Sequence, residues 1–124
     1  MTTANGETAP SSPTATAAER RVEERRAYRS TATVIAGTHQ FQVRTLDISR
    51  SGMCIVAAIN PQPNLRFKLR MRLDRQPQGP VTVEADVQVV HSVLASQESG
   101  FRIGLRFVNP GSQLLGAVNN FLGK

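Results

Sequence analysis

The most constraining feature of this 124-residue chain is a strict alternation of apolar and basic side chains over residues 65–73. Leucine, phenylalanine or methionine occupies every odd position, and arginine or lysine occupies four even positions, namely Arg66, Lys68, Arg70 and Arg72. Successive side chains of a β-strand point to opposite faces, so the pattern predicts a strand with one buried face and one cationic face. We call these four basic residues the cationic stripe. The apolar face requires other elements to cover it.

Neighbouring segments carry the same period of two. Strands are also expected over 31–36, 40–49, 53–58, 81–94 and 100–108. Turns or loops are expected at 37–39, 50–52, 60–64, 76–80 and 95–99, where glycine, proline and polar residues gather. The chain is therefore expected to form a small all-β domain.

The end of the chain changes to helical spacing. Apolar residues at positions 114, 115, 118, 121 and 122 fall on one face of a helix over 112–122. Ser112 is the expected N-cap and Gly123 the expected stop. Short antiparallel strands followed by one amphipathic helix favour a six-stranded antiparallel β-barrel with a C-terminal α-helix packed on it.

Composition divides the chain into a tail and a domain. Residues 1–18 are rich in threonine, alanine, serine and proline, with one charged residue and no aromatic residue. Such a segment buries too little apolar surface to fold, so we expect a disordered tail at 1–18 and one domain over 19–124. The tail has no secretory pattern, and no apolar run approaches membrane-spanning length, so membrane insertion is not expected.

The single cysteine, Cys54, excludes an internal disulfide and fits a reducing, cytoplasmic compartment. Because Met53 and Ile55 flank it, Cys54 is expected to be a small buried apolar residue. His39 falls in an expected turn and His91 in an apolar strand, with no spacing that matches a metal site or a catalytic triad. The protein is therefore expected to be no enzyme and to hold no metal or conventional cofactor.

The charge pattern predicts an anionic partner. The net charge is +6, and all basic residues except Lys68 and Lys124 are arginines. Arginine carries a planar fork of donors that binds phosphate or guanine at two points and stacks on bases, which lysine does not.

Residues 19–29 (ERRVEERRAYR) form a basic arm at the start of the domain. On a helix, Arg21, Arg25 and Arg29 would make a destabilising row of like charges, whereas an extended chain places Arg25 and Arg29 on one side. Apart from Tyr28, the arm has no apolar anchor strong enough to hold it, and its like charges repel one another. We therefore expect a mobile arm whose arginines converge when an anion binds.

Eighteen positions beyond Arg29, residues 47–52 read DISRSG. Asp47 and Ser49 are expected on the same face of a strand, and Gly52 provides a turn or a close backbone approach. Taken alone, the segment also fits ordinary turn chemistry, in which polar side chains bond nearby amides. Together with the arginines, it suits a ligand that carries both phosphates and guanine edges.

The two motifs, in this order, resemble the R-x-x-x-R and [DN]-x-S-x-x-G signatures of the PilZ domain, a bacterial receptor for the second messenger cyclic di-GMP. Residues 101–107 (FRIGLRF) are similar to a later segment of that family, so the likeness runs from about residue 20 to the C-terminus. The resemblance implies a six-stranded barrel with a C-terminal helix. It also implies that five residues bind cyclic di-GMP: Arg25, Arg29, Asp47, Ser49 and Gly52. Further candidate contacts are Arg21, Arg26 and Arg50.

The function implied is a non-catalytic receptor that passes its signal to an unidentified protein partner. One departure is Glu24, because the family often has Arg, Gln or an apolar residue before the first motif arginine. A carboxylate there is expected to repel a second dinucleotide, which leaves the stoichiometry open. Two alternatives remain: a nucleic-acid-binding barrel that uses the cationic stripe, and a PilZ-like module that binds only protein. The first ranks lower, because the stripe has no exposed aromatic residues on which bases could stack.

Overall fold

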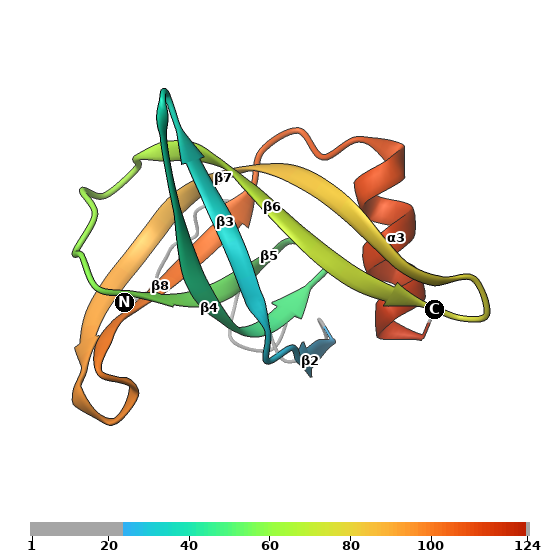
Figure 1. The fold of residues 1–124 in the computed structure, drawn as a ribbon, viewed down its shortest axis with the longest axis horizontal. Coiled ribbons are helices and arrows are strands. Elements are labelled where there is room, and N and C mark those ends of the chain that lie inside the picture. The colour runs from blue at the N-terminus through green and yellow to red at the C-terminus, as the bar shows by residue number, and fades with distance from the viewer. Residues whose placement is uncertain (1–23, 124) are drawn as a thin grey trace, which may run out of the picture.

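The computed structural model describes residues 24–123, so Arg21 and the tail expected at 1–18 lie outside the described residues. The strands are β2 (Arg25–Ala27), β3 (Thr31–Ala36), β4 (His39–Ser49), β5 (Gly52–Ala57), β6 (Arg66–Arg75), β7 (Gly79–Ala95) and β8 (Gly100–Phe107). A 3-10 turn, η1 (Ser96–Glu98), joins β7 to β8, and helix α3 (Ser112–Leu122) ends the fold (Figure 1).

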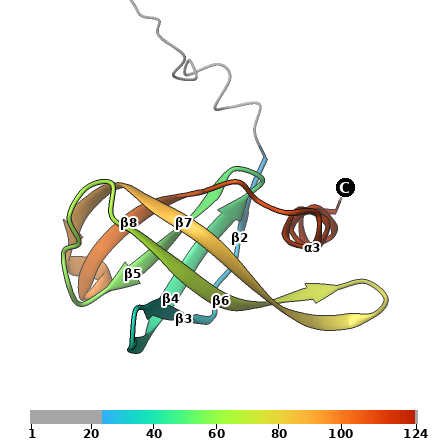
Figure 2. The same cartoon turned by 90° about the horizontal axis from the view of Figure 1, so that it is seen from above.

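Within these residues, six strands close into a ring. The order is β4, β3, β6, β7, β8 and β5, and β5 pairs again with β4. Every pairing in the ring is antiparallel. Closure leaves no unpaired edge in the ring. The expected six-stranded antiparallel barrel with a C-terminal helix is therefore confirmed (Figures 1 and 2).

Strand β6 shows why the alternating pattern specifies this fold. Leu69, Met71 and Leu73 are fully buried in the barrel core, while the cationic stripe on the same strand is exposed. Covering the apolar face removes it from water and contributes about 25 cal/mol for each Å² of apolar surface buried.

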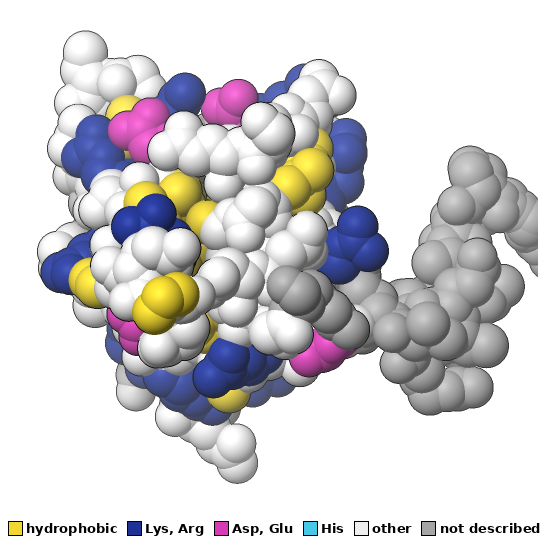
Figure 3. All heavy atoms as spheres, turned by 90° about the vertical axis from the view of Figure 1, so that its right-hand side faces the viewer, with side chains coloured by type: hydrophobic (Ala, Val, Ile, Leu, Met, Phe, Trp, Pro, Cys, Tyr) yellow, Lys and Arg dark blue, Asp and Glu magenta, His cyan; other side chains and the backbone are white. Residues whose placement is uncertain are grey.

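The cationic stripe faces acidic residues on the neighbouring strand. Across the β6–β7 pairing, Lys68 lies opposite Asp86 and Arg70 opposite Glu84. The Arg70 Nε atom is 3.1 Å from Glu84 Oε2, and Lys68 Nζ is 3.6 Å from Asp86 Oδ1. Part of the stripe is thus neutralised within the sheet. On the face drawn in Figure 3, acidic side chains likewise lie among the basic ones.

Helix α3 packs beside the β6–β7 hairpin (Figures 1 and 2). Its buried residues are Leu114, Ala117, Val118 and Leu122. Asn120 bonds the hairpin turn twice: its Oδ1 accepts from the Gln76 amide at 2.9 Å, and its Nδ2 donates to the Gln76 carbonyl at 3.2 Å. In the part of the chain that the structure describes, no helix is both long and apolar enough to cross a membrane.

The ends of α3 confirm one expected cap and correct the other. Gly123 adopts a left-handed φ of 85° as the C-cap, as its position predicted. The N-cap, however, is Gly111, and no side chain caps the helix there. Ser112 is already the first helical residue, so its hydroxyl is one position too late to accept from the free amides of the first turn.

Candidate functional site

Strand β2 brings the two motifs together. It pairs antiparallel with the end of β4, with Arg25 opposite Ser49 and Ala27 opposite Asp47. The Tyr28 amide then donates to the Leu46 carbonyl at 2.9 Å. Residues Arg25–Tyr28 of the first motif are therefore held by backbone pairing to the strand that carries the second.

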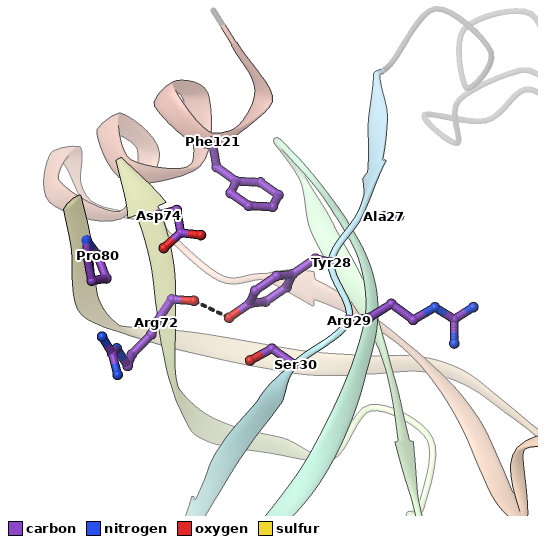
Figure 4. A pocket seen from close by; sticks show the side chains of 8 residues that line it. All are labelled: Ala27, Tyr28, Arg29, Ser30, Arg72, Asp74, Pro80 and Phe121. Atoms are coloured by element: carbon purple, nitrogen blue, oxygen red, sulfur yellow. Dashed lines mark hydrogen bonds between the residues drawn. The ribbon is translucent and has the colours of Figure 1, made fainter. Parts of the chain in front are cut away.

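Tyr28 anchors this segment to the fold. Its side chain is buried, its hydroxyl donates to the Arg72 carbonyl, and its ring packs edge-on against Phe121 with centroids 5.3 Å apart. Burial raises the pKa of the Tyr28 hydroxyl above its usual value. Figure 4 shows the Tyr28 ring between β2, β6 and α3, while the Arg29 side chain points to the opposite side.

In this structure Arg25–Ala27 pair with β4 and Tyr28 packs against the helix, and the expectation that the arm is mobile until an anion binds stays a prediction. The arm is a short strand because the end of β4 offers it free backbone groups and because Tyr28 reaches the helix. The rest of the arm, residues 19–23, lies outside the described residues.

Arg26 contacts the helix as well as the cavity wall. Its guanidinium carbon lies 4.6 Å from the centre of the Phe121 ring, and Nη1 donates to the Phe121 carbonyl in the last turn of α3. A cation is favourable at the C-terminal end of a helix, where carbonyls lack partners. Arg26 thus joins β2 to α3, and its role as a ligand contact stays a prediction.

The motif arginine Arg25 meets the motif carboxylate Asp47 directly. Arg25 Nη1 lies 3.0 Å from Asp47 Oδ1, although the two residues are 22 positions apart in sequence. A bulge in β4 between Thr45 and Asp47 changes the register opposite β5, and such bulges re-aim side chains. Asp47 reaches the same outward-facing cavity as Arg25 and Arg29.

That cavity has a volume of about 370 Å³. It is lined by Arg25, Arg26, Ala27, Arg29, Leu46, Asp47, Glu98 and Arg102. Leu46 belongs to a small apolar cluster with Cys54 and Val56, separate from the main core. Of the five ligand-binding residues implied by the resemblance, three line the cavity, namely Arg25, Arg29 and Asp47.

Ser49 and Gly52 are absent from the cavity wall. Ser49 is fully buried, and its hydroxyl donates to the Gly52 carbonyl at 3.2 Å. A Cβ on Gly52 would lie 2.0 Å from the Leu105 carbonyl oxygen, so this glycine allows β5 to approach β8. Both residues shape the turn that follows β4, and direct contact of either with a ligand stays a prediction. Arg50 is exposed in the same turn and also lies outside the cavity wall.

Sequence reasoning missed three further charged residues at the candidate site, namely Glu98, Arg44 and Arg102. Glu98, at the end of η1, lies within 4.0 Å of Arg29, Arg44 and Arg102. The alternation of side chains along β8 indicates that Arg102 is exposed, but only the tertiary structure places it in the cavity wall with the motif residues. Glu98 gave no sequence signal, because it lies in a polar link.

Cys54 and His91 do not line the cavity. Cys54 is a free, buried cysteine, as expected, and burial followed by the nearby Asp47 charge raises the pKa of its thiol. The His91 ring lies over Gly104, where a Cβ would be 2.3 Å from His91 Cε1. Among residues 24–123, no group of three or more His, Cys, Asp or Glu side chains is placed to hold a metal ion.

Several solved structures share this fold. The Bacillus subtilis inhibitor of motility, MotI/DgrA, matches with a TM-score of 0.72 and 15% identity, over 83% of this chain and 49% of that chain. This chain thus spans about half the length of that protein. The PilZ domain of Escherichia coli YcgR with c-di-GMP matches with a TM-score of 0.60 and 17% identity, over 84% of this chain and 89% of that chain.

A crystal structure of Escherichia coli YcgR in complex with c-di-GMP gives a TM-score of 0.59 and 19% identity, over 82% of this chain and 43% of that chain. At these identities the likeness concerns the fold. No curated protein sequence matches this chain. The family model of the PilZ domain matches residues 19–123, which include both motifs and the whole barrel. The chain therefore belongs to the PilZ domain family.

Proposed function

We propose that this protein is a non-catalytic bacterial receptor for cyclic di-GMP, with its receptor domain in residues 19–124. The observation that carries the proposal is the shared cavity: Arg25 and Arg29 of one motif and Asp47 of the other line a single opening on the outside of the barrel. Membership of the PilZ family and the c-di-GMP-bound YcgR domain support the choice of ligand.

Each of these side chains suits one part of the ligand. The guanidinium groups of Arg25 and Arg29 bind phosphate oxygens or the O6 and N7 edge of guanine, a contact worth about 1–3 kcal/mol of discrimination. The Asp47 carboxylate accepts from guanine N1–H and N2–H. A cyclic dinucleotide offers both kinds of partner at once.

The pair between Arg25 and Asp47 does not obstruct binding. The two side chains are 56% and 36% exposed, and exposed ion pairs contribute only about 0–1 kcal/mol. A ligand that offers a phosphate to Arg25 and a guanine edge to Asp47 replaces the pair at little cost.

The proposed signal is a change in the charge of the surface around the cavity when the ligand binds. Binding covers several arginines beside Leu46 with an anionic ligand and thereby neutralises much of the local positive charge. We propose that a cytoplasmic protein partner recognises the covered surface, since the domain has no reaction of its own through which to signal.

Isothermal titration with cyclic di-GMP tests the proposal. Wild type should bind, and Arg25→Ala or Arg29→Ala should each weaken binding at least about tenfold without unfolding the protein, because each removes charge-assisted contacts. Arg70→Ala is the matched control, since Arg70 pairs with Glu84 and does not line the cavity, so affinity should stay within about twofold of wild type.

Two results would contradict this assignment. Wild type that fails to bind cyclic di-GMP would favour the module that binds only protein. Wild-type affinity in both arginine variants would place the ligand elsewhere on the domain.

A further inference from the structure

Glu98 gathers arginines from three separate elements. Arg29 follows β2, Arg44 lies in β4 and Arg102 lies in β8. Their guanidinium nitrogens lie 4.0, 3.7 and 3.8 Å from the Glu98 carboxylate oxygens. Arg44 also donates to the Glu98 backbone carbonyl, which fixes the turn as well as the side chain. We call these four residues the Glu98 cluster.

Within the Glu98 cluster, the carboxylate is buried more deeply than the cations. The Glu98 side chain is 17% exposed, whereas Arg29, Arg44 and Arg102 are 68%, 50% and 47% exposed. The carboxylate therefore lies beneath the three guanidinium groups rather than in front of them. Each guanidinium has five N–H donors, so donors remain free on the solvent side after one edge faces Glu98.

The net charge of the Glu98 cluster is positive. One carboxylate against three guanidinium groups leaves two uncompensated positive charges beside the Arg25–Asp47 pair. Three arginines brought this close without a carboxylate would repel one another and take up other rotamers. Glu98 offsets that repulsion in the folded protein, so the arginines are already gathered when an anion arrives.

We infer that Glu98 is a positioning residue for phosphate recognition. It holds Arg29, Arg44 and Arg102 in one group that binds a phosphate of the dinucleotide, with Arg44 and Arg102 as phosphate-binding residues outside both motifs. The inference rests on the proposed function and assigns part of its site. The opposite role is a carboxylate that only competes with the ligand for the arginines, and the two roles predict opposite effects when the Glu98 charge is removed.

Titration of charge variants with cyclic di-GMP separates the two roles. Glu98→Gln keeps the size of the side chain and removes a negative charge, so pure competition predicts tighter binding. Positioning predicts at least about fivefold weaker binding. Glu98→Asp keeps the charge on a shorter side chain and should bind more tightly than Glu98→Gln. A role in packing alone would reverse this order, because glutamine is closer to glutamate in shape.

Arg44→Gln and Arg102→Gln test the two new ligand contacts. Each should weaken binding about five- to tenfold. Glu84→Gln is the matched control, because it removes the same charge from a glutamate that pairs with Lys68 and Arg70, and its affinity should stay within about twofold of wild type. Thermal unfolding of every variant identifies any loss that comes from unfolding.

Each outcome has a definite meaning. If wild type binds and Glu98→Gln binds equally well or more tightly, Glu98 is not a positioning residue. If Arg44→Gln and Arg102→Gln both keep wild-type affinity, the phosphate does not contact the Glu98 cluster, although the motif residues still form the site. If wild type does not bind at all, the proposed function fails first. Should the Glu98 variants unfold, the two arginine variants still decide whether the cluster binds the ligand.

Discussion

At the scale of single residues, the position of Asp47 is set by two neighbours. It forms an ion pair with Arg25 on one side and lies opposite buried Cys54 on the other. Its carboxylate is thus fixed at the border between the apolar cluster and the cavity. In the proposed complex, this acceptor suits guanine, which carries donors at N1 and N2, better than adenine, which carries none at N1.

We predict that Asp47→Ala loses guanine selectivity more than it loses overall affinity. Titration with cyclic di-GMP and cyclic di-AMP should give a ratio of affinities smaller than in wild type, because arginine contacts to phosphate serve both ligands. Asp86→Ala is the control, since Asp86 pairs with Lys68 away from the cavity and should keep the wild-type ratio. If Asp47→Ala keeps the wild-type ratio of affinities, the Asp47 carboxylate does not contact guanine.

A separate prediction concerns the stability of the protein when Gly52, the glycine of the second motif, is replaced. Gly52→Ala places a Cβ 2.0 Å from the Leu105 backbone oxygen, so β5 and β8 must move apart, and overpacking of this kind costs about 1–3 kcal/mol. Gly116→Ala is the control: nothing lies within 4 Å of its Cβ position, and alanine favours the helix by about 0.5–1 kcal/mol. In urea unfolding, the midpoint of Gly52→Ala should therefore be lower than that of wild type, and the midpoint of Gly116→Ala should be higher. A Gly52→Ala protein as stable as wild type would contradict the close approach.

At the scale of elements, β2 connects the cavity to helix α3. Arg25 and Arg29 line the cavity, while Arg26 and Tyr28 contact Phe121. This division follows from the alternation of side chains along an extended segment. The same five residues thus carry the proposed ligand-binding arginines, Arg25 and Arg29, on one side and the anchor of the segment on the other.

We predict that this anchor weakens at alkaline pH. The folded pKa of Tyr28 is raised above 10.0, so above that pH the unfolded chain loses the hydroxyl proton before the folded protein does. The stabilisation is present below pH 10 and declines as the pH rises through the folded pKa. Tyr28→Phe removes the bond to the Arg72 carbonyl and should cost about 1 kcal/mol at neutral pH.

Urea unfolding of wild type and Tyr28→Phe at several pH values measures this effect. The difference in stability between the two proteins should shrink above pH 10, because only wild type carries the titrating hydroxyl. A difference that stays constant with pH would show that the hydroxyl ionises alike in the folded and unfolded chains.

At the scale of the whole molecule, closure of the barrel determines where positive charge is available. The β6–β7 pairing sets Glu84 and Asp86 against the cationic stripe, so Lys68 and Arg70 form ion pairs within the sheet. The arginines around the cavity, by contrast, come from β2, β4 and β8 and outnumber the two carboxylates there. An anionic ligand therefore finds arginines from three strands gathered around one cavity, whereas the cationic stripe runs along a single strand.

The sequence by itself determined the barrel strands, the helix and the two motifs. Alternation and helical spacing are local properties of the chain, so strand β6 and helix α3 were readable from residues 65–73 and 112–122. The burial of Cys54 followed in the same way from its apolar neighbours. The motif residues were recognisable because their spacing along the chain is fixed.

Only the tertiary structure decided which of those residues share a surface. Strand β2 exists because β4 offers it a partner, and Ser49 is buried because the chain reverses at Gly52 against β8. The Glu98 cluster joins residues as far apart as Arg29 and Arg102, through the register of strands that are distant in sequence. Register between distant strands is fixed by closing the ring and packing its core, and no local pattern in the sequence records it.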